Sequence, residues 1–128
     1  EMIWSYSRAD AIRDGVLVEV PADITREAGI RFPVACSDHL WSYVSPDYMD
    51  ELPGQSENGR LWDLLHMFRL AAVQQRQTDR LTYRVIFVMK RFIGNKPIIG
   101  PETVTVQAVC GPGDNGEPVI TLMLPGDD

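Results

Sequence analysis

Residues 81–90 read LTYRVIFVMK, and their pattern is the strongest indication of the fold class. Large apolar side chains alternate there with a mixed second set, which is the period of a strand that buries one face. A strand of this kind needs other strands beside it and a layer of helices over its apolar face. The face expected to be buried consists of Leu81, Tyr83, Val85, Phe87 and Met89.

The segment before this strand is predicted to be the longest helix, from about Arg60 to Gln77. Its core-facing stripe repeats at helical spacing. A second, weaker stripe lies well round from the first, so the helix is apolar on two sides. Either other helices cover the second side, or it is a partner surface. The first stripe is Leu61, Leu64, Leu65, Phe68, Ala71 and Ala72, and the second is Trp62, Leu70 and Val73 with His66 among them.

After residue 90 the chain is predicted to be β. Turn residues stand at 94–97 and at 100–101, and strands are expected at 103–110 and 119–124. The last two strands form a hairpin around the glycine-rich stretch 111–116. We therefore predict one α+β domain, residues 1–128. It has an antiparallel sheet of about four strands, with helices packed mainly on one face.

Shorter elements are expected in the first half of the chain. Helix caps and glycine stops place three short helices, and β-branched residues place one strand. Whether that strand pairs within the sheet or at its edge stays open. The expected elements are a helix from Ser7 to Gly15, a strand at 16–20, a helix from Asp23 or Thr25 to Gly29, an extended segment after Pro33, a helix capped by Ser37 or Asp38, and a loop at 46–59.

The charge is unevenly distributed along the chain. The net charge is −6, but the segment from Leu64 to Pro101 holds seven basic residues and one acidic residue. The other residues include five basic and 17 acidic ones. An acidic excess disfavours general affinity for a nucleic-acid backbone and suits a basic protein partner or simple solubility.

The composition also limits location and cofactors. No apolar run approaches the roughly 18 residues of a membrane span, and no basic-then-apolar leader opens the sequence. Cys36 and Cys110 are expected to be reduced thiols of a cytoplasmic protein, with a single disulfide as the alternative. Their spacing fits no zinc site, so we expect no metal and no cofactor.

Four blocks of the sequence resemble an uncharacterised bacterial family known only as a domain of unknown function. The resemblance covers nearly the whole chain and implies no catalytic residues. Family members occur on plasmids, phages and other mobile elements, where small accessory proteins often blunt host defences or aid transfer. The blocks are residues 6–18 (YSRADAIRDGVLV), 24–35 (ITREAGIRFPVA), 59–63 (GRLWD) and 108–125 (AVCGPGDNGEPVITLMLP).

The loop from Cys110 to Glu117 is the strongest candidate site in the sequence. Its glycines could bring backbone amides near an anion, and Cys110 could act as a nucleophile if its pKa were lowered. Asp114, Asn115 and Glu117 offer oxygen ligands, but fewer than a calcium loop supplies. The alternative is a tight hairpin with positive-φ glycine, which needs the same composition.

Other residues allow both a functional and a structural interpretation. His39 or His66 could pair with a cysteine, although no local motif supports this. Arg60 is expected in the first turn of a helix, where a positive charge is unfavourable because the helix dipole is also positive at that end. It either pairs with an acid of the 47–57 loop or is a plain surface residue. The aromatic first half of the chain, which could form core or a binding hot spot, comprises Trp4, Tyr6, Trp41, Tyr43, Tyr48 and Trp62.

These patterns favour a non-catalytic, protein-binding domain, and the family resemblance implies an accessory protein of a mobile element, which could modulate host defence. A homodimer through Trp62, Leu70 and Val73 is equally compatible. The alternative is a small enzyme or ligand-binding domain with a site near Cys110 and a histidine. A third hypothesis is nucleic-acid binding by the basic run from Arg76 to Lys96. The net negative charge of the whole chain opposes it.

Overall fold

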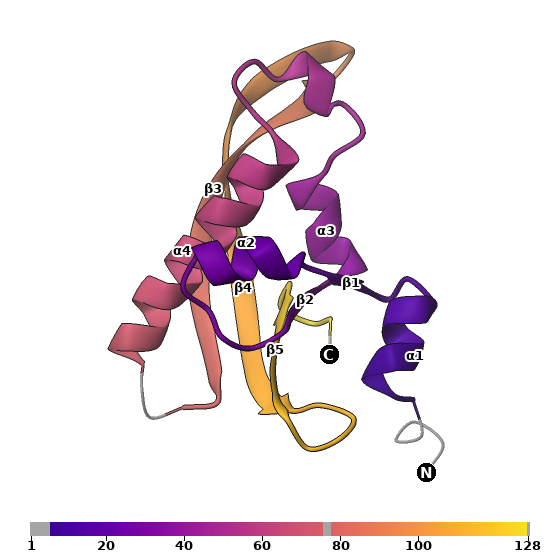
Figure 1. Ribbon diagram of the computed structural model, residues 1–128. Coiled ribbons are helices and arrows are strands. Elements are labelled where there is room, and N and C mark those ends of the chain that lie inside the picture. Colours follow the sequence, from indigo (N-terminus) through magenta and orange to yellow (C-terminus); the bar gives the residue numbers. More distant parts are fainter. Residues whose placement is uncertain (1–5, 76–77, 128) are drawn as a thin grey trace.

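Helices and a five-stranded sheet make up the protein in the computed structural model, which describes residues 6–75 and 78–127 (Figure 1). The strand order is β1-β2-β5-β4-β3. Trp4 and Arg76 lie outside the described residues. The elements are α1 (Arg8–Arg13), β1 (Leu17–Glu19), α2 (Ala22–Glu27), β2 (Val34–Ser37), α3 (Asp38–Val44), the 3₁₀ helix η2 (Met49–Glu51), α4 (Glu57–Gln74), β3 (Arg80–Ile93), β4 (Lys96–Pro112) and β5 (Pro118–Met123).

The α+β class is confirmed, with a sheet of five strands where about four were expected. The additional strand is β2, which was expected only as an extended segment. It pairs antiparallel with β1 and parallel with β5. All four of its residues are buried. A strand covered on both faces loses the alternation that reveals a half-buried strand, and β2 is also short.

The alternating stretch 81–90 forms the expected strand. Its five large apolar residues are buried, and β3 pairs antiparallel with β4 along its whole length. The turn expected at Gly100–Pro101 is wrong, because both residues lie within β4, opposite Met89 and Val88. Proline is tolerated there because β5 pairs with β4 only from Gln107 onward, so the strand has a single neighbour at Pro101.

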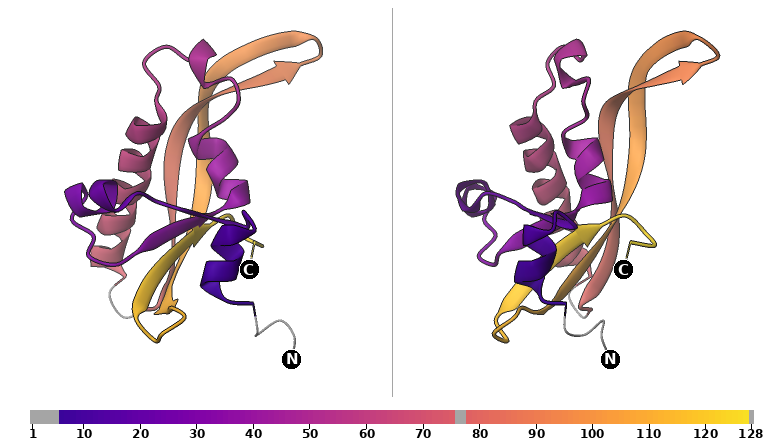
Figure 2. Two further views of the ribbon diagram at one scale, coloured as in Figure 1. Left: turned by 45° about the vertical axis from the view of Figure 1, so that its right-hand side comes forward. Right: turned by 90° about the vertical axis from the view of Figure 1, so that its right-hand side faces the viewer.

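Helix α4 crosses the apolar face of the sheet, beside α3 (Figures 1 and 2). It begins at Glu57, earlier than expected, because the Ser56 hydroxyl caps it by accepting from the Gly59 amide at 3.0 Å. The predicted core stripe is buried, except that Ala72 is half-buried. The Tyr83 hydroxyl donates to the Leu64 carbonyl at 2.9 Å, so sheet and helix are joined by a polar contact inside the core.

Arg60 corrects the sequence analysis, because it is neither paired with an acid nor on the surface. Only 2% of it is exposed. Its Nη1 donates to the Tyr43 carbonyl at 2.8 Å, and its Nη2 donates to the Val88 carbonyl. The guanidinium lies 5.1 Å from the Phe87 ring centre, and burial lowers its pKa. Arg60 therefore ties α3 and α4 to β3.

The end of the described chain is fastened by Asp127, which the sequence analysis did not single out. Its carboxylate accepts from the Ser37 hydroxyl at 2.7 Å and from the Leu124 amide at 2.9 Å. It also contacts Nδ1 of His39 at 2.8 Å. Ser37 caps α3 as expected, by accepting from the Leu40 amide. Asp127 thus holds the residues after β5 against the start of α3.

Candidate functional site

The main concave feature of the described residues is a cleft of about 870 Å³, a size typical of ligand sites. Three segments line it: the loop Gly29–Phe32, the second half of α4, and the β4–β5 hairpin. The apolar floor is buried and the rim is exposed. The apolar lining includes Ile30, Phe32, Phe68, Val73, Val119 and Ile120.

Among the described residues that line the cleft, two arginines are charged, Arg31 and Arg69. Arg69 Nη1 donates to the Ala28 carbonyl at 3.0 Å and so holds the end of α2 against α4. Gly29 is required beside it, because its φ is +81° and an added Cβ would lie 2.9 Å from Arg69 Nη1. An acidic protein thus presents a cleft with positive charge at its edge.

Cys110 lines this cleft, as the hypothesis of a site near it requires. Burial and the charge of Asp79 raise the pKa of its thiol, so it is mainly protonated at neutral pH and a weak nucleophile. Neither described histidine lines the cleft: His39 contacts Asp127 and His66 is exposed on α4. The cysteine–histidine pair of the enzyme hypothesis is therefore not assembled there. Both cysteines are free, as expected.

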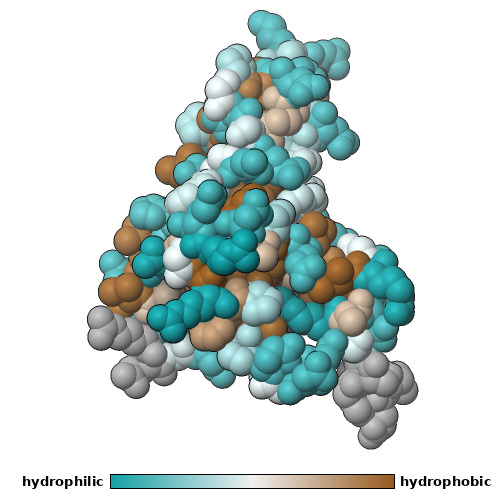
Figure 3. All heavy atoms as spheres, in the orientation of Figure 1, coloured by the Kyte–Doolittle hydropathy of each residue, from teal (hydrophilic) through white to brown (hydrophobic). Residues whose placement is uncertain are grey.

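The second stripe of α4 is exposed along its length. We call this surface the outer side of α4, and Val73 belongs both to it and to the rim of the cleft. Hydrophobic residues, in brown, show along the left edge of the space-filling view, where Figure 1 has α4 (Figure 3). The sequence left two alternatives for this side, a covering helix or a partner surface. Among the described residues, no helix covers it. The outer side consists of Trp62, Asp63, His66, Met67, Leu70 and Val73.

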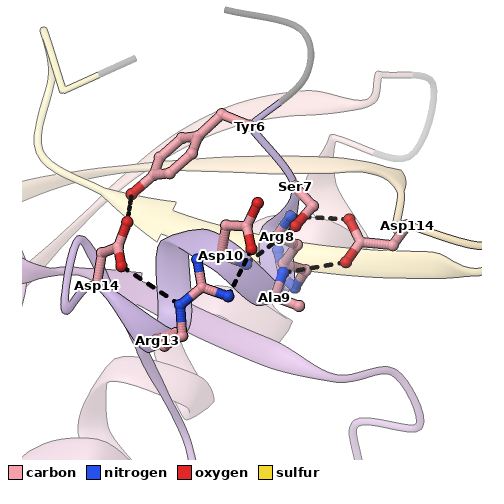
Figure 4. Close-up of polar contacts among 8 residues, drawn as sticks. All are labelled: Tyr6, Ser7, Arg8, Ala9, Asp10, Arg13, Asp14 and Asp114. Carbon is pink, nitrogen blue, oxygen red and sulfur yellow. Dashed lines mark hydrogen bonds and ion pairs between the residues drawn. The ribbon is translucent and has the colours of Figure 1, made fainter.

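Asp114 and Asn115 belong to the turn between β4 and β5, and neither side chain lines the cleft. Both carboxylate oxygens of Asp114 accept backbone amides of α1, from Arg8 at 2.8 Å and Ala9 at 3.0 Å (Figure 4). The tight-hairpin interpretation fits this geometry, with Gly116 at φ +82°. Asp114 therefore caps a helix from across the fold.

Arg8 strengthens the same connection. Its guanidinium donates to the Thr121 hydroxyl at 2.8 Å and to the Ile120 carbonyl at 3.0 Å. Ser7 caps α1 as expected, by accepting from the Asp10 amide at 3.0 Å. The first and last sequence blocks are thus in contact, and their polar residues hold α1 to β5.

The residues missed by the sequence analysis share one property. Arg69, Ile30 and Phe32 contribute to the cleft, but their segments are distant in sequence and only the fold brings them together. Among the described residues, no group of three or more histidine, cysteine or acidic side chains could hold a metal ion. No described helix is long and apolar enough to cross a membrane.

The comparisons with known proteins identify a family and give no relative with an assigned activity. No curated protein and no solved structure matches the chain. A family match extends over residues 1–128. The expected resemblance is confirmed: this chain belongs to DUF6573, a family of unknown function.

Proposed function

We propose that this protein is a non-catalytic accessory protein of a mobile element that binds another protein through the apolar cleft. The observation that carries the proposal is a concave, largely apolar surface assembled from α2–β2, α4 and β4–β5. Apolar anchors in desolvated pockets supply most of the affinity of protein complexes. The mobile-element part rests on the family resemblance alone.

The chemistry of the cleft favours binding over catalysis. The one nucleophilic side chain among its described lining residues, Cys110, has a raised pKa, and no histidine lies in that lining to take its proton. Val73 and Phe32 stand 60% and 44% exposed at the rim, where a partner would cover them. We therefore expect an apolar segment of the partner to lie between Phe32 and Val73.

A crosslinking experiment in host cells tests this proposal. A photoreactive phenylalanine analogue replaces Val73 in one variant and Ile86 in another. The two side chains are matched, with 60% and 61% exposure, but Ile86 does not line the cleft. We expect a defined protein adduct from position 73 and none from position 86.

The adduct is then checked with purified components. Val73→Asp should weaken binding of the crosslinked protein at least tenfold, because it places a charge at an apolar contact. Ile86→Asp should leave the Kd unchanged. The proposal is wrong if position 73 gives no specific adduct, or if Val73→Asp binds as tightly as the wild type.

A second candidate function is the binding of a small molecule in the same cleft, favoured by its volume of about 870 Å³. Arg31 and Arg69 would select an apolar molecule with a negative group. Dodecanoate should then slow thiol labelling of Cys110, and dodecyltrimethylammonium should not. Equal labelling rates with both would remove this candidate.

A further inference from the structure

The β3–β4 hairpin extends beyond the rest of the sheet as an arm, residues 90–99. β5 pairs only with residues 107–112 of β4, so the arm is a two-stranded ribbon. It curves away from the body of the molecule (Figures 1 and 2). Residues 91–99 are all exposed, and its large apolar side chains are Phe92 at 62%, Ile93 at 67%, Ile98 at 41% and Ile99 at 49%.

The base of the arm is held in place by side-chain contacts. Lys90 Nζ lies 2.6 Å from Glu51 Oε1 and 5.4 Å from the Phe92 ring centre. Arg60 binds the Val88 carbonyl just below. The arm is therefore a projection whose base is fixed to the body of the protein. A patch of exposed apolar side chains, such as the four on the arm, usually marks an interaction surface.

The tip of the arm is basic as well as apolar. Residues 91–99 include Arg91 and Lys96 and no acidic residue, and neither cation forms an ion pair with a described residue. A surface that fits the tip must offer apolar area together with negative charge.

The outer side of α4 has these two properties. Trp62, Met67 and Leu70 are 40%, 36% and 47% exposed. By helical spacing, Asp63 lies between Leu70 and Met67 on the helix surface. Asp63 is the one acidic residue among the described residues of this side, and Arg69 lies at its edge, next to Val73 in the cleft. The outer side is thus apolar with one negative charge.

We propose that the arm of one copy packs against the outer side of α4 in a second copy of this chain. Apolar side chains would meet apolar side chains, and Arg91 or Lys96 would face Asp63. The negative charge on the receiving surface is that of Asp63, which lies just before the basic segment 64–101 that contains the arm.

Two other partners fit the arm less well. Three of its four large apolar residues are isoleucines, whose side chains cannot stack on bases as aromatic rings do. The net charge of −6 opposes approach to a nucleic-acid backbone and to an anionic bilayer. A second copy supplies the complementary charge itself.

The contact joins two different surfaces, so its symmetry has consequences for assembly. A two-fold dimer would contain the contact twice, once in each direction. If the second contact cannot form, copies would add head to tail and the mass would grow with concentration. Light scattering separates these two arrangements and detects either one.

The test uses the purified full chain and two complementary variants. Phe92→Asp damages the arm, and Trp62→Asp damages the outer side of α4. Each should lower the association constant at least tenfold and give the monomer mass at concentrations where the wild type associates. Mixing them should restore a complex, because one variant keeps an intact arm and the other an intact outer side.

Val16→Asp is the matched control, because Val16 is 45% exposed but belongs to neither surface. It should assemble like the wild type. Circular dichroism of each variant checks that it is folded, and Ile98→Asp replaces Phe92→Asp if that variant is not. Vesicles containing phosphatidylglycerol and a DNA duplex are tested with the same samples.

The outcomes decide the proposal. Wild-type monomer at about 1 mM, which excludes even weak association, overturns it. So does an arm variant that keeps the wild-type mass, or a mixture of the two variants that stays monomeric. The protein could instead be monomeric and bind vesicles or DNA. If Phe92→Asp abolishes that binding, the arm belongs to that partner and the proposal is wrong.

Discussion

At the scale of single residues, Arg60 has the clearest effect on stability. Arg60→Ala would remove the donors for the Tyr43 and Val88 carbonyls and leave a cavity beside Phe87. We expect the free energy of unfolding to fall by about 3 kcal/mol, as when a buried partner is lost. Urea denaturation measures this. Arg31→Ala is the control, because Arg31 is exposed; equal stability of both variants would contradict the assignment.

The two cysteines should differ in reactivity. Cys36 is fully buried, which raises its pKa to about 12. Cys110 is half-buried, and burial and Asp79 raise its pKa. A thiol probe at neutral pH should therefore label Cys110 first, but more slowly than free cysteine. Labelling of Cys110 faster than free cysteine would indicate an activated thiolate and would favour the enzyme hypothesis.

The contact of His39 with Asp127 predicts a pH dependence. The Asp127 hydrogen bond and the charges of Asp38 and Asp127 raise the pKa of His39. The stability that protonated His39 contributes is therefore fully present below about pH 6.5 and is lost as the pH rises through the raised pKa. Burial raises the pKa of Asp127, but hydrogen bonds from Ser37, His39 and Leu124 outweigh it. The pKa of Asp127 is lowered overall, so the stability that its carboxylate contributes is lost only as the pH falls through the lowered pKa.

Thermal unfolding at two pH values measures this dependence. His39→Ala should lower the Tm more at about pH 5.5 than at about pH 8.5, on either side of an ordinary histidine pKa. Leu70→Ala, at an exposed position of α4 and without a titratable side chain, is the control and should change the Tm equally at both pH values. A Tm loss for His39→Ala that is the same at both pH values would disprove the assigned charge interaction.

At the scale of elements, α1 depends on a cap from the other end of the sequence. Asp114→Ala would free the Arg8 and Ala9 amides, and we expect a loss of about 1 kcal/mol, typical of a helix cap. Hydrogen exchange should speed up at these amides. Asn115→Ala is the neighbouring control, because no described contact involves that side chain. Unchanged exchange in Asp114→Ala would contradict the cap.

Elements with a local signal could be predicted from the sequence. The alternation of 81–89, the stripe of α4 and the serine caps of α1 and α3 each depend on neighbours along the chain. β2 was missed because burial on both faces removes its alternation. Gly100–Pro101 suggested a turn because glycine and proline are typical turn residues. Both fit into β4 because the strand has a single neighbour at that point. That position depends on where β5 stops, which the local sequence does not reveal.

The candidate site was predictable only in part. Val73 and Cys110 were named in advance and lie in the cleft, whereas Asp114 caps a helix and Trp62 lies along α4. Phe32 and Arg69 carry no distinguishing local pattern. Arg60 did carry one, because it lies four residues before Leu64, beside the core stripe, where burial could have been inferred.

At the scale of the whole molecule, net charge should govern association with DNA. The cations of the arm are outnumbered in a chain of net charge −6. We therefore expect no retardation of a DNA duplex at about 50 mM salt, where phosphate contacts are strong. Gel shift over a salt series measures this. A shift at low salt that disappears at high salt would support nucleic-acid binding by the basic segment.

The place of β5 in the middle of the sheet has a consequence for biosynthesis. It is the last of the five strands of this sheet to be made, yet it separates β2 from β4. On the ribosome, the β3–β4 hairpin can form early, because its strands are adjacent in sequence. β1 and β2 can pair with each other, but they join the β3–β4 hairpin in one sheet only after residues 118–123 have emerged. Completion of the sheet is therefore a late, long-range step, and until then a nascent chain exposes the edges that chaperones protect.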